Sequence, residues 1–192
     1  MINVHPFVSF LSSHIKVNDA EAEKMVALLK HYSFAKNEII QQQGEIPRTV
    51  SFIIKGAVRS YYVDEKGSEQ TVNIIFENQP FVPFDSFAHQ TPSGISIMTL
   101  EVTEAIGVNH AEFYRFLEAY PKYEAALISI MSQYVVLESE HSKLLRINPA
   151  RDRYEALCKA RPELITRVPL KYIASYIGMT LETLSRIRAG KL

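Results

Sequence analysis

Short β-rich runs follow one another from Glu38 to Asn109 and restrict this part of the chain to an all-β architecture. The runs read EIIQQ, TVSFIIK, AVRSYYV, TVNIIF, ISIMTLEV and EAIGV, and turn signals such as Lys55-Gly56 separate them. Short strands at intervals of roughly 8–12 residues are typical of a sandwich or a small barrel. No helical segments alternate with the runs, so a sheet built from βαβ units is not expected.

Segments with helical periodicity precede and follow the β-rich region. Residues 18–31 are expected to form a helix that Asn18 caps. After a short helix that follows His110, Pro121 opens a long helix that extends to about residue 146, because proline suits the first helical turn. The dipeptide Asn148-Pro149 then breaks the pattern and predicts a hinge.

These boundaries divide the chain into three segments. We expect a sensor-like β domain at residues 1–120, a long helix at 121–147 and a second domain at 148–192.

The long helix carries an apolar stripe that predicts a dimer interface. Its members step by three or four residues, and Ile128 and Val135 widen it. About 38 Å of helix is more than one small barrel can cover, which favours packing against a second copy. The alternative is a helix packed wholly within its own chain. The predicted interface residues are Leu127, Met131, Tyr134, Leu137, His141 and Leu144.

The composition is that of a globular protein, with 47% apolar and 22% charged residues. No apolar run approaches the roughly 18–20 residues that a membrane-spanning helix needs, and the first residues make a poor signal peptide. Cys158 is the only cysteine, which excludes an intramolecular disulfide and a cluster held by several thiolates. We expect a cytoplasmic protein with no membrane partner.

The charge is zero overall but unevenly distributed. Residues 147–192 hold nine Lys and Arg against four Asp and Glu, a net +5, and the first 146 residues hold twelve against seventeen, a net −5. Such a division is typical of an acidic body with a basic nucleic-acid-binding head, although chance can produce an excess of this size.

Residues 168–189 have the pattern of a helix-turn-helix. Gly178 ends the first short helix, because glycine tolerates the left-handed backbone of a helix C-terminus. Thr180 is placed to cap the second helix, and Ala174 is small enough for two helices to cross closely. The inner faces are expected to comprise Leu170, Ile173, Ala174 and Ile177 in the first helix and Leu184 and Ile187 in the second.

The outer face of the second helix carries side chains that can read DNA. Arg186 can bind guanine and Glu182, four residues earlier, can accept from cytosine. The alternative is an ordinary surface salt bridge between them. The helix-turn-helix pattern and the basic surroundings favour DNA contact. The predicted DNA-binding residues are Lys171, Thr180, Glu182, Thr183, Ser185, Arg186 and Arg188.

Four stretches carry a family resemblance: KNEIIQQQGE (36–45), FIIKGAVRSYYVDEKGSEQTV (52–72), PARDRY (149–154) and IASYIGMTLETLSRIR (173–188). With them the chain resembles the CRP/FNR family of bacterial transcription regulators. The resemblance implies an α+β fold with an N-terminal double-stranded β-helix (a β-roll of the cyclic-nucleotide-binding type), a long dimerisation helix and a C-terminal winged helix-turn-helix. The wing is expected to be shortened, because the sequence ends soon after the second helix.

The resemblance also implies partners. It predicts a symmetric homodimer on a palindromic site in double-stranded DNA, with RNA polymerase as a further candidate partner. Glu182, Ser185 and Arg186 stand where family members place base-reading residues.

The cyclic AMP site of the family is not matched. Family members that bind cyclic AMP use a Gly-Glu pair and an Arg-Ser or Arg-Thr pair, whereas residues 78–98 contain no Arg or Lys. A buried phosphodiester needs a paired cation or aimed N–H groups, and Pro83 removes one such donor. We therefore expect no cyclic AMP in the usual mode, and predict no other cofactor. The remaining pocket is expected to hold a less charged ligand or to be a collapsed aromatic core, with Tyr61, Phe76, Phe81, Phe84 and Ile97 as its lining.

Three functions are therefore compared. The leading hypothesis is a dimeric, sequence-specific DNA-binding transcription regulator. The second is a ligand-sensing or protein-interaction module whose helix-turn-helix no longer reads DNA. The third, a β-barrel metalloenzyme, is the weakest, because the six histidines show no HxH, HxxxH or HExxH spacing. We expect no metal site, no catalytic residues and no enzymatic activity.

Overall fold

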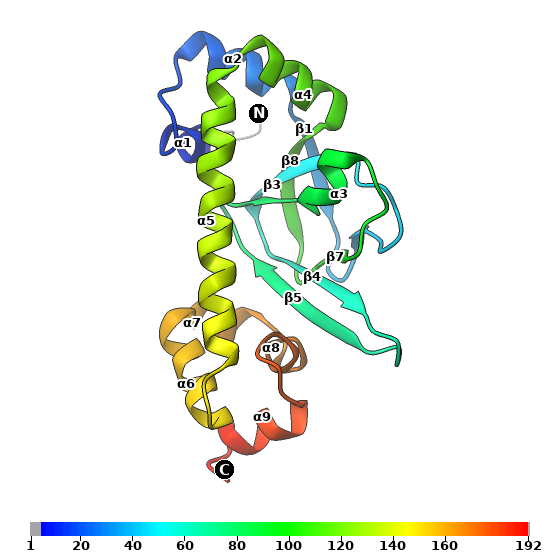
Figure 1. Ribbon diagram of the computed structural model, residues 1–192, viewed down its shortest axis with the longest axis vertical. Coiled ribbons are helices and arrows are strands. Elements are labelled where there is room, and N and C mark those ends of the chain that lie inside the picture. Colours follow the sequence, from blue (N-terminus) through cyan, green and yellow to red (C-terminus); the bar gives the residue numbers. More distant parts are fainter. Residues whose placement is uncertain (1–4, 192) are drawn as a thin grey trace. The chain divides into compact units, whose positions relative to one another are not determined.

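The computed structural model describes residues 5–191 and shows a mixed α+β protein (Figure 1). It divides into two compact units. The first comprises the residues up to Tyr62 together with Asn73–Met131, and the second comprises Val63–Val72 together with the residues from Ser132 onward. This division differs from the three segments expected from the sequence, because the boundary falls inside the long helix rather than at Asn148-Pro149.

Two four-stranded sheets form the β-roll. One has the order β1 (Lys30–Phe34), β8 (Thr103–Asn109), β3 (Thr49–Lys55) and β6 (Pro80–Phe81). The other has the order β2 (Ile39–Gln41), β7 (Ser96–Thr99), β4 (Val58–Val63) and β5 (Glu69–Ile75). The pairings β1–β8, β3–β8, β3–β6, β2–β7 and β4–β7 are all antiparallel, as an all-β region without βαβ units requires. The expected β-roll is confirmed.

The core of the roll is apolar. It consists of side chains contributed by both sheets, and one glycine permits a close approach of two strands. A Cβ at Gly107 of β8 would lie 2.8 Å from Thr49 Cγ2 and 2.9 Å from Ser51 Oγ on β3, so only glycine fits there. The core residues are Ile53, Val58, Ile75, Phe81, Ile97 and Ala105, with Phe34 and Ile40 packed against them.

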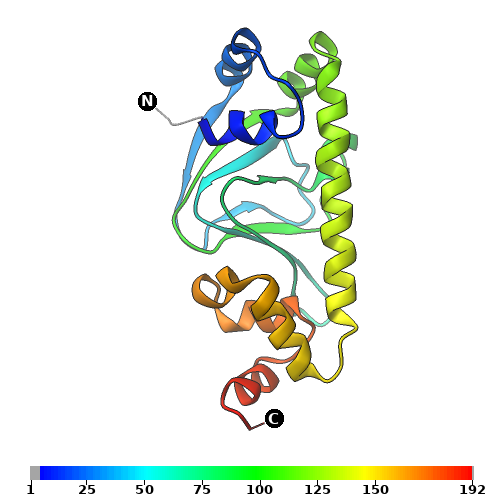
Figure 2. The same ribbon diagram turned by 90° about the vertical axis from the view of Figure 1, so that its left-hand side faces the viewer.

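Four helices accompany the roll: α1 (His5–Ser12), α2 (Asp19–Leu28), α3 (Phe84–His89) and α4 (His110–Ala119). The sequence analysis did not predict α1, which lies beside the β-roll (Figure 2). It packs on β3 through Phe7 and Phe10, each with its ring about 5 Å from the ring of Phe52. Asn18 caps α2 through a capping box, as expected. The helix ends at Leu28 instead of residue 31, because β1 begins at Lys30.

The long helix α5 (Lys122–Leu145) begins directly after Pro121, as predicted. It is followed by α6 (Ala150–Ala160), α7 (Pro162–Arg167), α8 (Leu170–Tyr176) and α9 (Leu181–Arg188). Pro162 lies in the first turn of the short helix α7. Over residues 170–191 the structure has two helices and their turns, without a β-hairpin that would form a wing. Within residues 5–191, no helix is both long and apolar enough to span a bilayer.

Candidate nucleic-acid interface and β-roll cavity

The helix-turn-helix follows from a few local contacts. Gly178 has a positive φ of 62° and ends α8, where the Met179 N–H donates to the Ala174 carbonyl at 3.0 Å. The Thr180 hydroxyl then caps α9 by accepting the Thr183 N–H at 3.1 Å. Both local predictions are confirmed. Five of the six side chains expected on the inner faces are buried, namely Ile173, Ala174, Ile177, Leu184 and Ile187, while Leu170 is half-buried.

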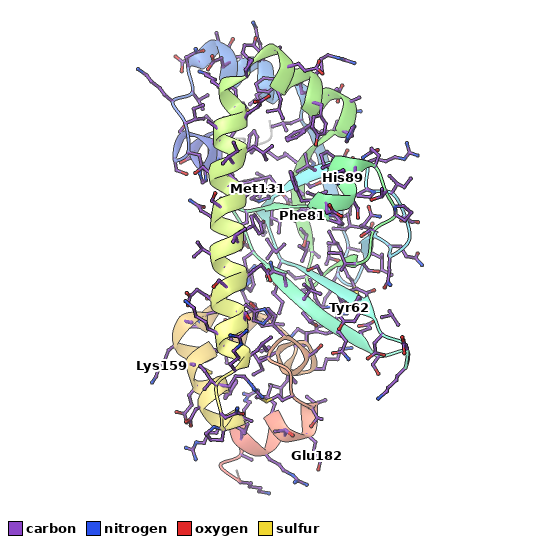
Figure 3. The ribbon with its side chains drawn as sticks, viewed as in Figure 1. Tyr62, Phe81, His89, Met131, Lys159 and Glu182 are labelled. Carbon is purple, nitrogen blue, oxygen red and sulfur yellow. The ribbon has the colours of Figure 1, made fainter. Side chains whose placement is uncertain are left out.

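The outer face of α9 is open to solvent. Glu182, Ser185 and Arg186 are exposed, and Figure 3 shows Glu182 projecting outward from the helix. Arg186 Nη2 lies 2.6 Å from Glu182 Oε1, with 59% and 73% of the two side chains exposed. The salt bridge considered as an alternative is therefore formed in the DNA-free protein. It orients the guanidinium while leaving its other N–H groups available, and an exposed pair of this kind contributes only about 0.3–0.5 kcal/mol to folding.

The other predicted DNA-binding residues occupy different surroundings. Thr180 uses its hydroxyl as the helix cap, and the half-buried Thr183 bonds to that hydroxyl at 2.9 Å. Lys171 is exposed at the start of α8, with its ammonium 4.6 Å from the centre of the Tyr172 ring. Arg188 is exposed in the last turn of α9. Lys171, Ser185 and Arg188 are therefore exposed, whereas the two threonine hydroxyls bond to each other at the start of α9.

Two contacts that the sequence analysis missed hold α8 within the second unit. His141 of α5 stacks on Tyr176 with ring centroids 4.1 Å apart, and its Nε2 lies 2.8 Å from the Tyr176 carbonyl oxygen. On Ser175, the hydroxyl oxygen accepts the Thr71 N–H at 2.8 Å and the hydroxyl donates to the Glu69 carbonyl at 3.3 Å. Burial raises the pKa of Tyr176, and the nearby Arg161 opposes that rise.

The β4–β5 hairpin tip, residues 63–72, thus belongs to the second unit. Its turn is fixed by Asp64, whose carboxylate accepts the N–H groups of Lys66 and Ser68 at 2.9 Å. A hydrogen bond from Gln70, with help from these N–H groups, lowers the pKa of the Asp64 carboxyl. No motif in the sequence predicts that this hairpin tip contacts α8, which lies more than 100 residues later in the chain.

The predicted dimer stripe on α5 is largely turned toward its own chain. Leu127, Met131, Tyr134, His141 and Leu144 are half-buried, and of the six predicted residues only Leu137 is exposed. Burial raises the pKa of Tyr134 to about 12.

The side of α5 that carries Ile128 and Val135, the two residues expected to widen the stripe, is solvent-exposed, and six positions along it are uncharged. Ile128 is 67% and Val135 is 69% exposed, and Ile130, 200° further around the helix from Ile128, is buried. The exposed positions alternate by three and four residues, which is the spacing of a coiled-coil seam. We call this face the outer seam. It consists of Ala125, Ile128, Ser132, Val135, Ser139 and Ser142.

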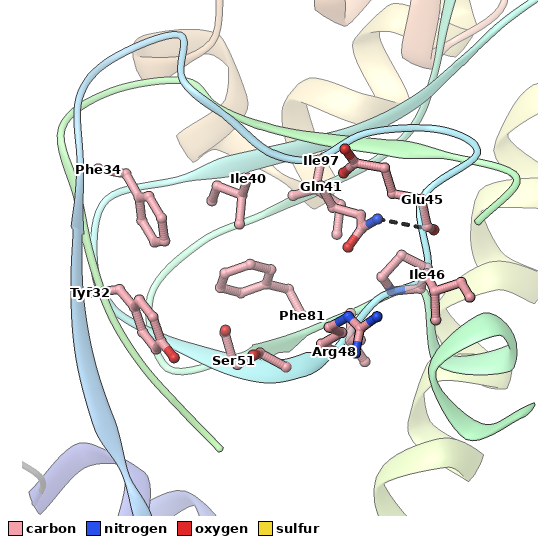
Figure 4. A pocket seen from close by; sticks show the side chains of 13 residues that line it. Tyr32, Phe34, Ile40, Gln41, Glu45, Ile46, Arg48, Ser51, Phe81 and Ile97 are labelled. Atoms are coloured by element: carbon pink, nitrogen blue, oxygen red, sulfur yellow. Dashed lines mark hydrogen bonds between the residues drawn. The ribbon is translucent and has the colours of Figure 1, made fainter. Parts of the chain in front are cut away.

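A cavity of about 590 Å³ opens inside the β-roll (Figure 4). Phe81 and Ile97 are the members of the predicted pocket that line it. Tyr61 and Phe76 are buried elsewhere in the fold, and Phe84 is half-buried at the start of α3. The full lining is Tyr32, Phe34, Ile40, Gln41, Glu45, Ile46, Arg48, Thr49, Ser51, Phe81, Val82, Pro83 and Ile97.

Arg48 is the cation among the lining residues that the sequence did not predict. The expected anion-binding segment was residues 78–98, whereas Arg48 precedes β3. The backbone beside it is anchored, because the Arg48 carbonyl accepts the His110 N–H at 2.9 Å and the Pro47 carbonyl accepts Gln90 Nε2 at 3.1 Å.

Comparisons with known proteins agree with this architecture. A family model described as "Cyclic nucleotide-binding domain" matches residues 32–120. The c-di-GMP responsive global regulator CLP of Xanthomonas campestris is similar in structure, with a TM-score of 0.73, 13% identity, and coverage of 90% of this chain and 91% of that chain. FixK2 from Bradyrhizobium japonicum gives a TM-score of 0.70 at 20% identity, covering 84% and 83%. The Thermus thermophilus Catabolite Activator Protein gives 0.60 at 17%, covering 94% and 85%. No curated protein sequence matched the chain significantly.

Proposed function

Because the chain carries a cyclic nucleotide-binding domain at residues 32–120 and has the fold of the CRP/FNR regulators, we propose that it is a sequence-specific, DNA-binding transcription regulator that acts as a dimer. The observation that carries the proposal is the open outer face of α9, on which Glu182, Ser185 and Arg186 are exposed. The inner faces of α8 and α9 are buried, and α9 is capped at its start. The net +5 charge of residues 147–192 supports it.

In this proposal α9 lies in the major groove. Arg186 donates two hydrogen bonds to a guanine, while Glu182 accepts from a cytosine on the neighbouring base pair. The salt bridge between them at 2.6 Å is exchanged for these contacts or shared with them. Lys171, Ser185 and Arg188 bind phosphates and set the position of the helix.

Dimerisation is proposed to use the outer seam. Its six positions carry no charge, and its small side chains at residues 125, 132, 139 and 142 permit two helices to approach closely. A symmetric pair of helices would present two α9 helices to half-sites about one DNA turn apart, which matches a palindromic operator. A regulator of this kind acts in the cytoplasm, and RNA polymerase is a candidate partner there.

Cyclic AMP is not the proposed effector. No Lys or Arg occurs between Lys66 and Arg115, so the segment from β6 through α3 to β7 offers no cation to a phosphodiester. Pro83 at the start of α3 also lacks an N–H group.

Selection of bound sequences from random DNA tests DNA recognition, palindromy and half-site spacing in one experiment. We expect an enriched palindrome with half-sites about 10–10.5 base pairs apart, centre to centre. The affinity for it should fall steeply with added salt, because phosphate contacts release counterions. Failure to enrich any sequence, with salt-insensitive or no binding, would favour the alternative of a sensing or protein-interaction module with a degenerate DNA-binding domain.

A further inference from the structure

Two groups of side chains face each other across the β-roll cavity, with Phe81 between them (Figure 4). One group contains the apolar Phe34 and Ile40 and also the polar Gln41 and Glu45. The other group, which we call the polar side, contains Tyr32, Ser51 and Arg48. A volume of about 590 Å³ falls within the usual range for small-molecule pockets, which are mostly apolar with a few placed polar groups.

The polar side holds donors that the fold leaves unused. Ser51 is only 7% exposed, and among residues 5–191 its hydroxyl forms no hydrogen bond. Over the same residues the Arg48 guanidinium has neither a hydrogen bond nor an ion pair. Both groups are therefore free to bind an acceptor that enters the cavity.

The charge of the cavity limits what that acceptor can be. Arg48 is its only cation, and Glu45 contributes one carboxylate, which already accepts the Gln42 N–H at 3.2 Å. The first 146 residues also carry a net −5. A multiply charged phosphate is disfavoured in this setting, whereas one carboxylate matches the fork of one guanidinium.

We propose that the β-roll cavity binds a small amphipathic monocarboxylate with an aromatic or compact aliphatic body. Its carboxylate pairs with Arg48 and accepts from the Ser51 hydroxyl. Its apolar body packs against Phe34, Ile40 and Phe81. The hydrogen bonds at the Pro47 and Arg48 carbonyls fix the backbone from which the Arg48 side chain reaches the cavity.

The role of this acid as an effector rests on the proposed function, but its binding to the cavity does not require DNA. Direct binding is therefore measured on the DNA-free full chain, so failure of the ligand and failure of DNA recognition are separate results. The chain has no tryptophan to report binding by fluorescence, so calorimetry is used.

The probe is 3-phenylpropionate, with its amide as the uncharged match and cyclic AMP as the competitor. We expect saturable, one-to-one binding of the acid, at least tenfold weaker binding of the amide, and no displacement by cyclic AMP. Arg48→Gln should weaken the acid at least tenfold and Ser51→Ala about threefold, since a charged hydrogen bond contributes more than a neutral one. Arg115→Gln, the same change on an exposed arginine outside the cavity, should leave binding unchanged.

Thermal unfolding of the unliganded variants separates loss of binding from loss of folding, and Arg48→Gln should melt with the parent protein because its side chain is exposed. Absence of saturable binding by the acid, equal binding of acid and amide, or an Arg48→Gln variant that binds like the parent would each overturn the proposal.

Discussion

Arg186→Ala separates a DNA-reading side chain from one that only stabilises its helix. The guanidinium is 59% exposed and its one partner in the folded chain is Glu182, four residues earlier at 2.6 Å. Loss of such an exposed pair should lower the free energy of unfolding by about 0.5 kcal/mol or less. Loss of a bidentate contact to guanine should cost about 1–3 kcal/mol of binding for each half-site, or roughly 5- to 150-fold in affinity. The expected cost in binding therefore exceeds the expected cost in folding.

The assay is fluorescence anisotropy of a labelled operator taken from the random-DNA selection. A set of operators changed at one base pair at a time shows which position loses discrimination, because the variant should tolerate any base at the position that Arg186 reads. Arg115→Ala, on α4 in the other compact unit, is the matched loss of an exposed arginine and should bind like the parent. An Arg186→Ala variant with an unchanged affinity and base profile would refute the reasoning, and chemical denaturation of the same sample shows whether it is folded.

Three further predictions concern the scaffold. Val135→Glu should convert a dimer to a monomer in sedimentation experiments, because it places charge on the outer seam, whereas Gln133→Glu on the same helix should not. Gly178→Ala should lower the free energy of unfolding by about 1–2 kcal/mol. The added Cβ would lie 3.5 Å from Leu145 Cδ2, an ordinary van der Waals distance, so the expected destabilisation comes from the positive φ alone. A larger decrease in the free energy of unfolding, measured by denaturant titration, would contradict this. The Glu21 carboxylate accepts a hydrogen bond from the Lys122 ammonium at 2.6 Å, which lowers the pKa of its carboxyl. Its stabilising effect is therefore present above the ordinary pKa of glutamate and is lost as the pH falls through the lowered value. The free energy of unfolding of Glu21→Gln should accordingly depend less on pH below about 5 than that of the parent protein. An unchanged pH dependence in this range would contradict the prediction.

Local features of the sequence were sufficient to predict much of the fold. Gly178 and Thr180 act within one turn of their own positions, so their residue types alone predict the end of α8 and the cap of α9. Pro121 predicts the start of α5 for the same reason. The strand order of the β-roll could be expected only through the family resemblance, because pairings such as β1 with β8 join segments about 70 residues apart.

The sites were less predictable because they depend on which side of an element faces which neighbour. The apolar stripe from Leu127 to Leu144 has the composition both of a dimer face and of a face that packs within the chain, so its role as a dimer interface stays a prediction. The outer seam is rich in serine, and serine gives no hydrophobic signal. The family resemblance did not predict Arg48, because it directs attention to residues 78–98 as the anion-binding segment. The cation of this cavity comes instead from the loop before β3.

The hairpin tip makes the second unit discontinuous along the chain. Residues 63–72 pack with the segment from Ser132 onward, and Ser175 bonds to two of them. A fragment cut at Asn148-Pro149 or at Ser132 would leave that hydroxyl without its protein partners and would expose the side of α8 that the tip covers. Helix α8 is thus not part of a module that begins at residue 148, and an insertion or deletion in the β4–β5 turn would change the contacts of α8 directly.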